Sequence, residues 1–213
     1  MRKGFDTPAH VTKFLACLRA DRYNFVCRYY NVNNQAKNLT LAEAVAISSA
    51  GLGIVAVWEN GFPTSAAYFS YAKGIFDGTS AYHYAQNEIR QPGGTPIYFA
   101  VDFDATQTNI KHVISEYFQG VNDAFNNISS NQPVYNVGVY GSGMVCSAML
   151  ASNFATYSWL AQSRGWGGSK TFTGYNIKQS MQVVICKAMG GGVAGDPDES
   201  PNDNEGSFTV TLS

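Results

Sequence analysis

The chain has 213 residues, of which 45% are apolar and 14% are charged, and its formal net charge is −1. This length suits one α/β domain, and the near-neutral charge excludes the basic surface with which proteins bind nucleic acid. No apolar run approaches the roughly 20 residues needed to span a bilayer. We therefore expect a globular protein with no nucleic-acid partner and no membrane span.

Strand-like and helix-like segments alternate along the chain. Short runs rich in β-branched and aromatic residues predict strands, and apolar residues spaced three or four apart predict helices. The predicted strands cover residues 3–6, 25–30, 53–58, 96–103, 134–140, 156–161, 173–179 and 182–188. The predicted helices cover residues 8–20, 40–51, 64–90, 109–128 and 142–151. We expect the third helix to break near Asp77-Gly78, and Thr40 and Glu43 to form a capping box at the start of the second.

Repeated β-then-α units at this length predict a single (β/α)8 TIM-like barrel over residues 1–213, with a polar tail from about residue 197. A doubly wound sheet is the alternative. It is disfavoured because no GxGxxG sequence follows the first predicted strand.

The cysteines and histidines give no pattern of metal ligands. Cys17, Cys27, Cys146 and Cys186 lack CxxC or CxxH spacing, and the three histidines are equally dispersed. Buried free thiols are the favoured interpretation, ahead of a disulfide or a metal site. We expect no metal and no cofactor.

The amino terminus runs directly into the first predicted strand, without the charged and apolar regions of a secretory signal. We therefore expect synthesis in the cytoplasm. Action on a substrate outside would then require export or lysis.

Four carboxylates stand at the ends of predicted strands. Asp6 ends the first, Glu59 follows the third, and Asp102 and Asp104 end the fourth. In a barrel of parallel strands these ends meet at one mouth, where active sites of this fold are built. Crowded carboxylates raise one another's pKa, and glycoside hydrolysis uses one protonated and one ionised acid. The four acids are therefore the catalytic candidates. The structural alternative is that Asp104 caps a helix and Asp6 binds loop amides.

Several motifs spread over nearly the whole chain match one family. They are Gly4-Phe-Asp6, Phe25-Val-Cys-Arg28-Tyr29-Tyr30, Gly93-Gly-Thr-Pro-Ile-Tyr98-Phe-Ala-Val-Asp102-Phe-Asp104, Trp159-Leu-Ala161, Tyr175-Asn-Ile-Lys-Gln179 and Asp196-Pro-Asp198. In these motifs the chain resembles the glycoside-hydrolase-like domain family (domain of unknown function 1906), which is similar to the family 25 lysozymes, the muramidases. The resemblance implies a barrel that recognises or cleaves the glycan of bacterial peptidoglycan, at the bond following N-acetylmuramic acid.

The chain departs from the lysozymes at the end of the fourth strand. The lysozymes have Asp-x-Glu there, with the Glu as acid, whereas this chain has Asp102-Phe-Asp104. We expect Asp102 to be ionised, Asp104 or Glu59 to donate the proton, and Asp6 to orient the site.

The expected substrate-binding residues surround these acids. Arg28 is expected to pair with Asp6 or Asp102, or else to form a structural ion pair inside the barrel. Four aromatic residues are candidates for sugar-stacking walls or for core positions. The full set is Arg28, Tyr30, Trp58, Tyr140, Trp159, Gln179 and Asp196.

Three functions stay open from the sequence. The first is a muramidase-like antibacterial enzyme that acts in the periplasm or cell wall, delivered by a phage lysis system or a toxin-export apparatus. Its partners would be peptidoglycan and either a delivery system or an immunity protein. The second is a non-catalytic cell-wall glycan-binding barrel. The third is a barrel hydrolase that acts on a cytoplasmic sugar.

Overall fold

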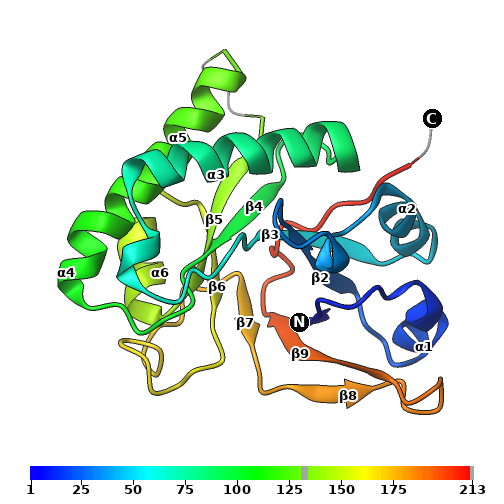
Figure 1. Ribbon diagram of the computed structural model, residues 1–213. Coiled ribbons are helices and arrows are strands. Elements are labelled where there is room, and N and C mark those ends of the chain that lie inside the picture. The colour runs from blue at the N-terminus through cyan, green and yellow to red at the C-terminus, as the bar shows by residue number, and fades with distance from the viewer. Residues whose placement is uncertain (131–133, 212–213) are drawn as a thin grey trace.

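A closed barrel forms the centre of the protein in the computed structural model, which describes residues 1–130 and 134–211 (Figure 1). Strands β1 to β7 are parallel neighbours in chain order, and β9 closes the ring by pairing antiparallel with both β7 and β1. The strands are β1 (Arg2–Asp6), β2 (Phe25–Tyr30), β3 (Gly53–Trp58), β4 (Pro96–Ala100), β5 (Asn136–Gly141), β6 (Tyr157–Leu160), β7 (Ile177–Gln179), β8 (Val183–Ile185) and β9 (Val193–Ser200). The fold is thus the expected TIM-like barrel, with its last strand reversed.

Helices cover the outside of the barrel between successive strands. They are α1 (Leu15–Ala20), α2 (Leu41–Ser49), α3 (Tyr71–His83), α4 (Gln107–Asn109), α5 (Ser115–Ile128) and α6 (Gly143–Ala151), with short 3-10 or π turns at Thr12–Phe14, Gln35–Lys37, Ala66–Tyr68, Tyr84–Ile89 and Ile110–Ile114. Their apolar faces pack on the strands, and every residue of β3 is buried. Within the described ranges, none of the helices is long and apolar enough to cross a membrane.

Helix α3 runs without a break through Asp77-Gly78, so the predicted interruption is wrong. Glycines in α3 and in the neighbouring α5 allow the two helices to pack closely instead. A Cβ on Gly74 would lie 2.0 Å from the Tyr117 carbonyl oxygen, and one on Gly120 would lie 2.3 Å from the carbonyl oxygen of Tyr71. Glycine is required where two backbones approach this closely, so α3 and α5 pack directly against each other.

The strand that closes the barrel is β9, not the predicted strand over 182–188. That segment contains β8, which pairs with β9 alone. The predicted polar tail from residue 197 also begins too early, because β9 extends to Ser200. Farther along, Phe208 and Val210 are buried, and Phe208 pairs with Ile54. Residues 212–213 of the predicted tail lie outside the described residues.

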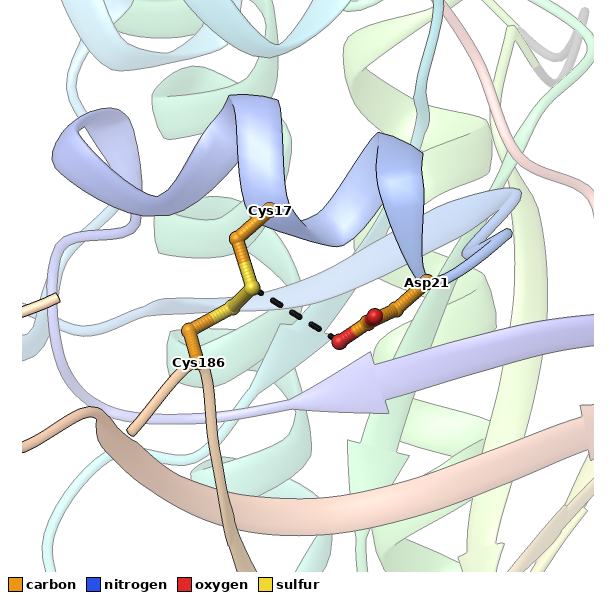
Figure 2. Close-up of side chains that lie close together, drawn as sticks. All are labelled: Cys17, Asp21 and Cys186. Atoms are coloured by element: carbon orange, nitrogen blue, oxygen red, sulfur yellow. Dashed lines mark hydrogen bonds between the residues drawn. A yellow bond between two sulfur atoms is a disulfide. The ribbon is translucent and has the colours of Figure 1, made fainter. Parts of the chain in front are cut away.

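A disulfide joins Cys17 in α1 to Cys186 just after β8, with a Cα–Cα distance of 5.9 Å (Figure 2). The prediction of four free thiols is therefore wrong for this pair and confirmed for Cys27 and Cys146, which are free and buried. The Asp21 carboxylate lies 3.6 Å from the sulfur of Cys17. Because both thiols are consumed in the bond, this group offers no thiolate to a metal.

Candidate active site

A pocket of about 180 Å³ lies at the carboxyl ends of the parallel strands. Three carboxylates line it: Glu59 follows β3, Asp102 follows β4, and Asp196 lies in β9. Because β9 runs antiparallel to β1 and β7, its first half lies at this end of the barrel. There the backbone of Asp196 is in register with the backbone of Asp6. The other lining residues are Tyr29, Val57, Ala100, Tyr140, Trp159, Gln162 and Gln179. We call this cavity the acid pocket.

The side chain of Gln179 connects the acids beneath the pocket. Its Nε2 donates to Asp6 Oδ2 at 2.8 Å and to Asp196 Oδ2 at 3.2 Å. Its Oε1 accepts from the Tyr140 hydroxyl at 2.9 Å and from the backbone N–H of Gln162 at 3.2 Å. With bonds at both ends, the amide has one favoured orientation, and it holds the two carboxylates close together.

Asp6 lies under the pocket and is only 3% exposed. Burial raises its pKa from 3.8 to about 7; hydrogen bonds from Gln179 and Tyr29 lower the pKa, whereas the charges of Asp196 and Glu59 raise it. Asp6 therefore changes between its protonated and ionised forms near neutral pH. A carboxyl with this behaviour is common in acid–base sites.

Asp102 and Glu59 have different surroundings although they share the pocket. The pKa of half-buried Asp102 is raised, first by burial and then by the negative charge of Glu59. Glu59 Oε2 lies 2.6 Å from the ammonium nitrogen of Lys37, with which it forms an ion pair. The two acids thus differ, because burial and the charge of Glu59 raise the pKa of Asp102, whereas Glu59 is paired with a cation.

Two acceptor atoms of the lining residues lack a donor within the described chain. They are Asp196 Oδ1 and Gln162 Oε1, both buried. Burial also raises the pKa of Asp196. Buried acceptors without partners are rare in native proteins, so these two atoms are candidates to receive hydroxyl or amide donors from a ligand.

Asp104 does not line the pocket. Its side chain is exposed, and Oδ1 accepts a hydrogen bond from the backbone N–H of Gly167 at 2.8 Å. It does not cap the next helix either, because Thr106 holds that position. Asp104 anchors the loop that follows β6.

Three of the expected binding residues face away from the pocket. Arg28 is fully buried and donates from Nε and Nη2 to the two carboxylate oxygens of Glu43, each at 3.1 Å. It therefore pairs with neither Asp6 nor Asp102 but forms a structural ion pair, the alternative expectation, between β2 and α2. Tyr30 is buried with its hydroxyl on Gln91, and Trp58 is buried in the core.

Strand alternation explains this correction. Successive side chains of a strand point to opposite faces. In β2, Tyr29 lines the pocket while Tyr30 faces the helices, and in β3, Val57 lines the pocket while Trp58 faces the helices. The aromatic residues that do line the pocket are Tyr140 and Trp159, as expected, and their rings pack edge to face at 5.2 Å.

Three further residues that were not predicted from the sequence belong to the site: Tyr29, Gln162 and Asp198. Tyr29 donates to Asp6 Oδ1 at 3.0 Å, and Gln162 lines the pocket. Asp198 accepts from Trp159 Nε1 at 2.9 Å, and its pKa is raised well above the usual range, first by burial and then by the charge of Asp6. The two-residue spacing of Asp196 and Asp198 could have signalled a strand with both side chains on one face.

Known proteins are similar to this chain in sequence and in fold. The family model of the Rv2525c-like, glycoside hydrolase-like domain matches residues 16–190. YbfG of Bacillus subtilis is 35% identical over 161 residues, which make up 71% of this chain but 22% of YbfG, so the chain spans about a fifth of that relative.

Among solved structures, the Tat-secreted protein Rv2525c of Mycobacterium tuberculosis has a TM-score of 0.77 at 18% identity, covering 97% of this chain and 98% of that one. A muramidase of Acremonium alcalophilum has a TM-score of 0.55 at 15% identity, covering 95% of each chain. The autolysin LytC of Streptococcus pneumoniae, solved with a synthetic peptidoglycan ligand, has a TM-score of 0.58 at 12% identity, covering 93% of this chain and 46% of LytC. The resemblance inferred from the motifs is thereby confirmed, and the chain belongs to the Rv2525c-like, glycoside hydrolase-like domain family.

Proposed function

We propose that this protein, taken as one barrel domain over residues 1–213, hydrolyses the glycan strand of bacterial peptidoglycan as a muramidase does. The observation that carries the proposal is the acid pocket, in which three carboxylates with different surroundings meet at the mouth of a barrel. The structural likeness to a muramidase and to the autolysin LytC supports this choice of substrate.

In the proposed reaction, Asp102 gives its proton to the glycosidic oxygen as the bond from that oxygen to the sugar carbon breaks. Glu59 stabilises the positive charge on that carbon or holds the N-acetyl group. Water then forms a bond to that carbon and gives a proton back to Asp102, which restores the acid. Buried Asp6 acts through Gln179, which orients Asp196. These roles reverse those expected from the sequence for Asp102 and Glu59, because the raised pKa favours Asp102 as the donor.

The sugar is held by two acceptor atoms that have no hydrogen-bond donor within the described chain, and by two aromatic rings. Asp196 Oδ1 and Gln162 Oε1 accept from its hydroxyl or N-acetyl N–H groups. Tyr140 and Trp159 supply aromatic contact at the pocket wall.

The test is digestion of purified peptidoglycan, followed by mass spectrometry for new reducing ends at muramic acid. Asp102→Asn should lower the rate about a hundredfold or more, while the melting temperature stays unchanged or rises because a buried repulsion is removed. Glu59→Gln should also be impaired. Asp104→Asn is the matched control, because asparagine still accepts from Gly167 and the residue lies outside the pocket. The proposal is wrong if Asp102→Asn and Glu59→Gln both cleave like the parent and the Asp104→Asn control.

The second candidate is a barrel that binds cell-wall glycan without cleaving it. It is favoured by one observation: Asp104, which stands where the lysozymes have their acid, anchors a loop instead. Retention of the parent protein on peptidoglycan without new reducing ends would decide for this candidate.

We place the site of action outside the cytoplasm. The disulfide suits an oxidising compartment, and Rv2525c is a Tat-secreted protein. Delivery as a phage lysis protein or as an exported toxin, with a delivery or immunity partner, belongs to the same proposal.

A further inference from the structure

A second groove of about 650 Å³ adjoins the acid pocket. It lies between the loop after β6, strand β7 and the segment leading to β8, and it shares Gln162 and Gln179 with the acid pocket. The two cavities are therefore neighbours. We call it the cationic groove, after its charged lining residues Arg164, Lys170 and Lys178.

Its charge is opposite to that of the acid pocket. Among the described residues that line the groove there is no carboxylate. Arg164 and Lys170 are exposed and form no ion pair within residues 1–130 and 134–211, while Lys178 lies 3.4 Å from Glu199. Arg164 and Lys170, with no acid among the lining residues, produce a local positive field that attracts an anionic group.

The groove is held in shape by the loop that carries two of these cations. The N–H of Gly167 donates to Asp104 Oδ1 at 2.8 Å, its carbonyl accepts from the N–H of Met144 at 2.9 Å, and Ser169 Oγ accepts from the N–H of Gly143 at 3.1 Å. Phe172 and Tyr175, with ring centroids 6.4 Å apart, add aromatic surface. The cations are thus mounted on an anchored loop next to the acid pocket.

We propose that the cationic groove binds the carboxylate-bearing peptide attached to muramic acid while the glycan occupies the acid pocket. This inference rests on the proposed function. The sugar rings carry neutral N-acetyl and hydroxyl groups, and the lactyl carboxyl group of muramic acid is consumed in the amide bond to the peptide. The negative charge of peptide-substituted glycan therefore lies on the carboxylates of the peptide. Two unpaired cations beside a sugar site therefore match the peptide carboxylates, and the groove favours peptides with free carboxylates over amidated ones.

The test measures binding by calorimetry at low and high salt. The probe is N-acetylglucosaminyl-N-acetylmuramic acid carrying a dipeptide with free carboxylates, compared with the same molecule after amidation of those carboxylates. This disaccharide ends at muramic acid, so the proposed reaction has no bond to cut and the parent protein can be used. The double variant Arg164→Ala/Lys170→Ala removes the two unpaired cations. Lys13→Ala, an exposed lysine far from the groove in the sequence, is the matched control.

The parent should bind the free-carboxylate probe about tenfold more tightly than the amidated one at low salt, and this preference should shrink at high salt. The double variant should keep less than about a twofold preference, and Lys13→Ala should keep all of it. Equal affinity of the parent for both probes, or no binding of the free-carboxylate probe, overturns the groove proposal. If charge-dependent binding occurs but peptidoglycan is never cleaved, the hydrolase proposal fails and the groove stands. If cleavage occurs without the preference, only the groove proposal fails.

Discussion

Replacing both Cys17 and Cys186 with serine removes a covalent tie between α1 and the segment after β8 (Figure 2). The two residues are 169 positions apart, so the bond closes most of the chain into one loop in the unfolded state. For a loop of this length the chain-entropy estimate is about 5 kcal/mol, and residual structure in the unfolded chain reduces it. We expect a loss of roughly 3–5 kcal/mol in the free energy of unfolding, a large share of the total for a typical domain.

Urea unfolding followed by circular dichroism measures this loss. The oxidised parent should have the highest urea midpoint, and the reduced parent and the double serine variant should have lower midpoints similar to each other. Reductant should not change the midpoint of the variant. Alkylation of the denatured, unreduced parent should label two of its four cysteines, Cys27 and Cys146. Equal midpoints for the oxidised and reduced parent would show that the bond does not stabilise the fold. Labelling of all four cysteines before reduction would show that it does not form.

Three further predictions concern the acids, a buried ion pair and metals. The pKa of Asp6 is about 7 in the folded state and 3.8 in the unfolded state, so the folded state binds the proton more tightly. The stabilisation from this proton is greatest below pH 4 and is lost as pH rises toward 7. Asp6→Asn should flatten this slope in thermal melts from pH 4 to 8, and an unchanged slope would contradict the assignment. Glu43→Ala leaves Arg28 buried without its partner and should cost about 3–5 kcal/mol in urea unfolding, against less than about 0.5 kcal/mol for exposed Lys13→Ala. Any glycan cleavage should survive dialysis against a chelator, because no metal is expected to take part. Loss of cleavage that a divalent ion restores would refute this.

The barrel and the position of its mouth could be predicted because parallel strands covered on both faces are continuous apolar runs. The ends of these runs are visible in the sequence, and with them Asp6, Glu59 and Asp102. Which neighbour faces inward is harder to predict where both are aromatic or apolar, since Tyr29 and Tyr30 fit either face of β2 equally well. For Tyr30 and Trp58 the sequence left a sugar-stacking wall and a core position open, and the structure places both in the core.

The remaining errors have a common origin in contacts between distant segments. Strand β9 is acidic because Asp196 and Asp198 point toward the site, so its composition resembles that of a loop. Glu43 fits a capping box by its spacing. Thr40 does cap the helix, but the Glu43 carboxylate is held by Arg28 of strand β2. No local spacing specifies such pairings.

The reversed last strand has a consequence for how this barrel can be joined to other modules. Arg2 lies opposite Ser200, and Phe208 pairs with Ile54 near the start of β3, so both ends of the described chain lie at the amino ends of the parallel strands. A partner fused at either end would emerge on the side opposite the acid pocket and leave it open to a polymer. The architecture therefore suits tandem and chimeric arrangements, and carriers or reporters can be attached at either end without covering the mouth.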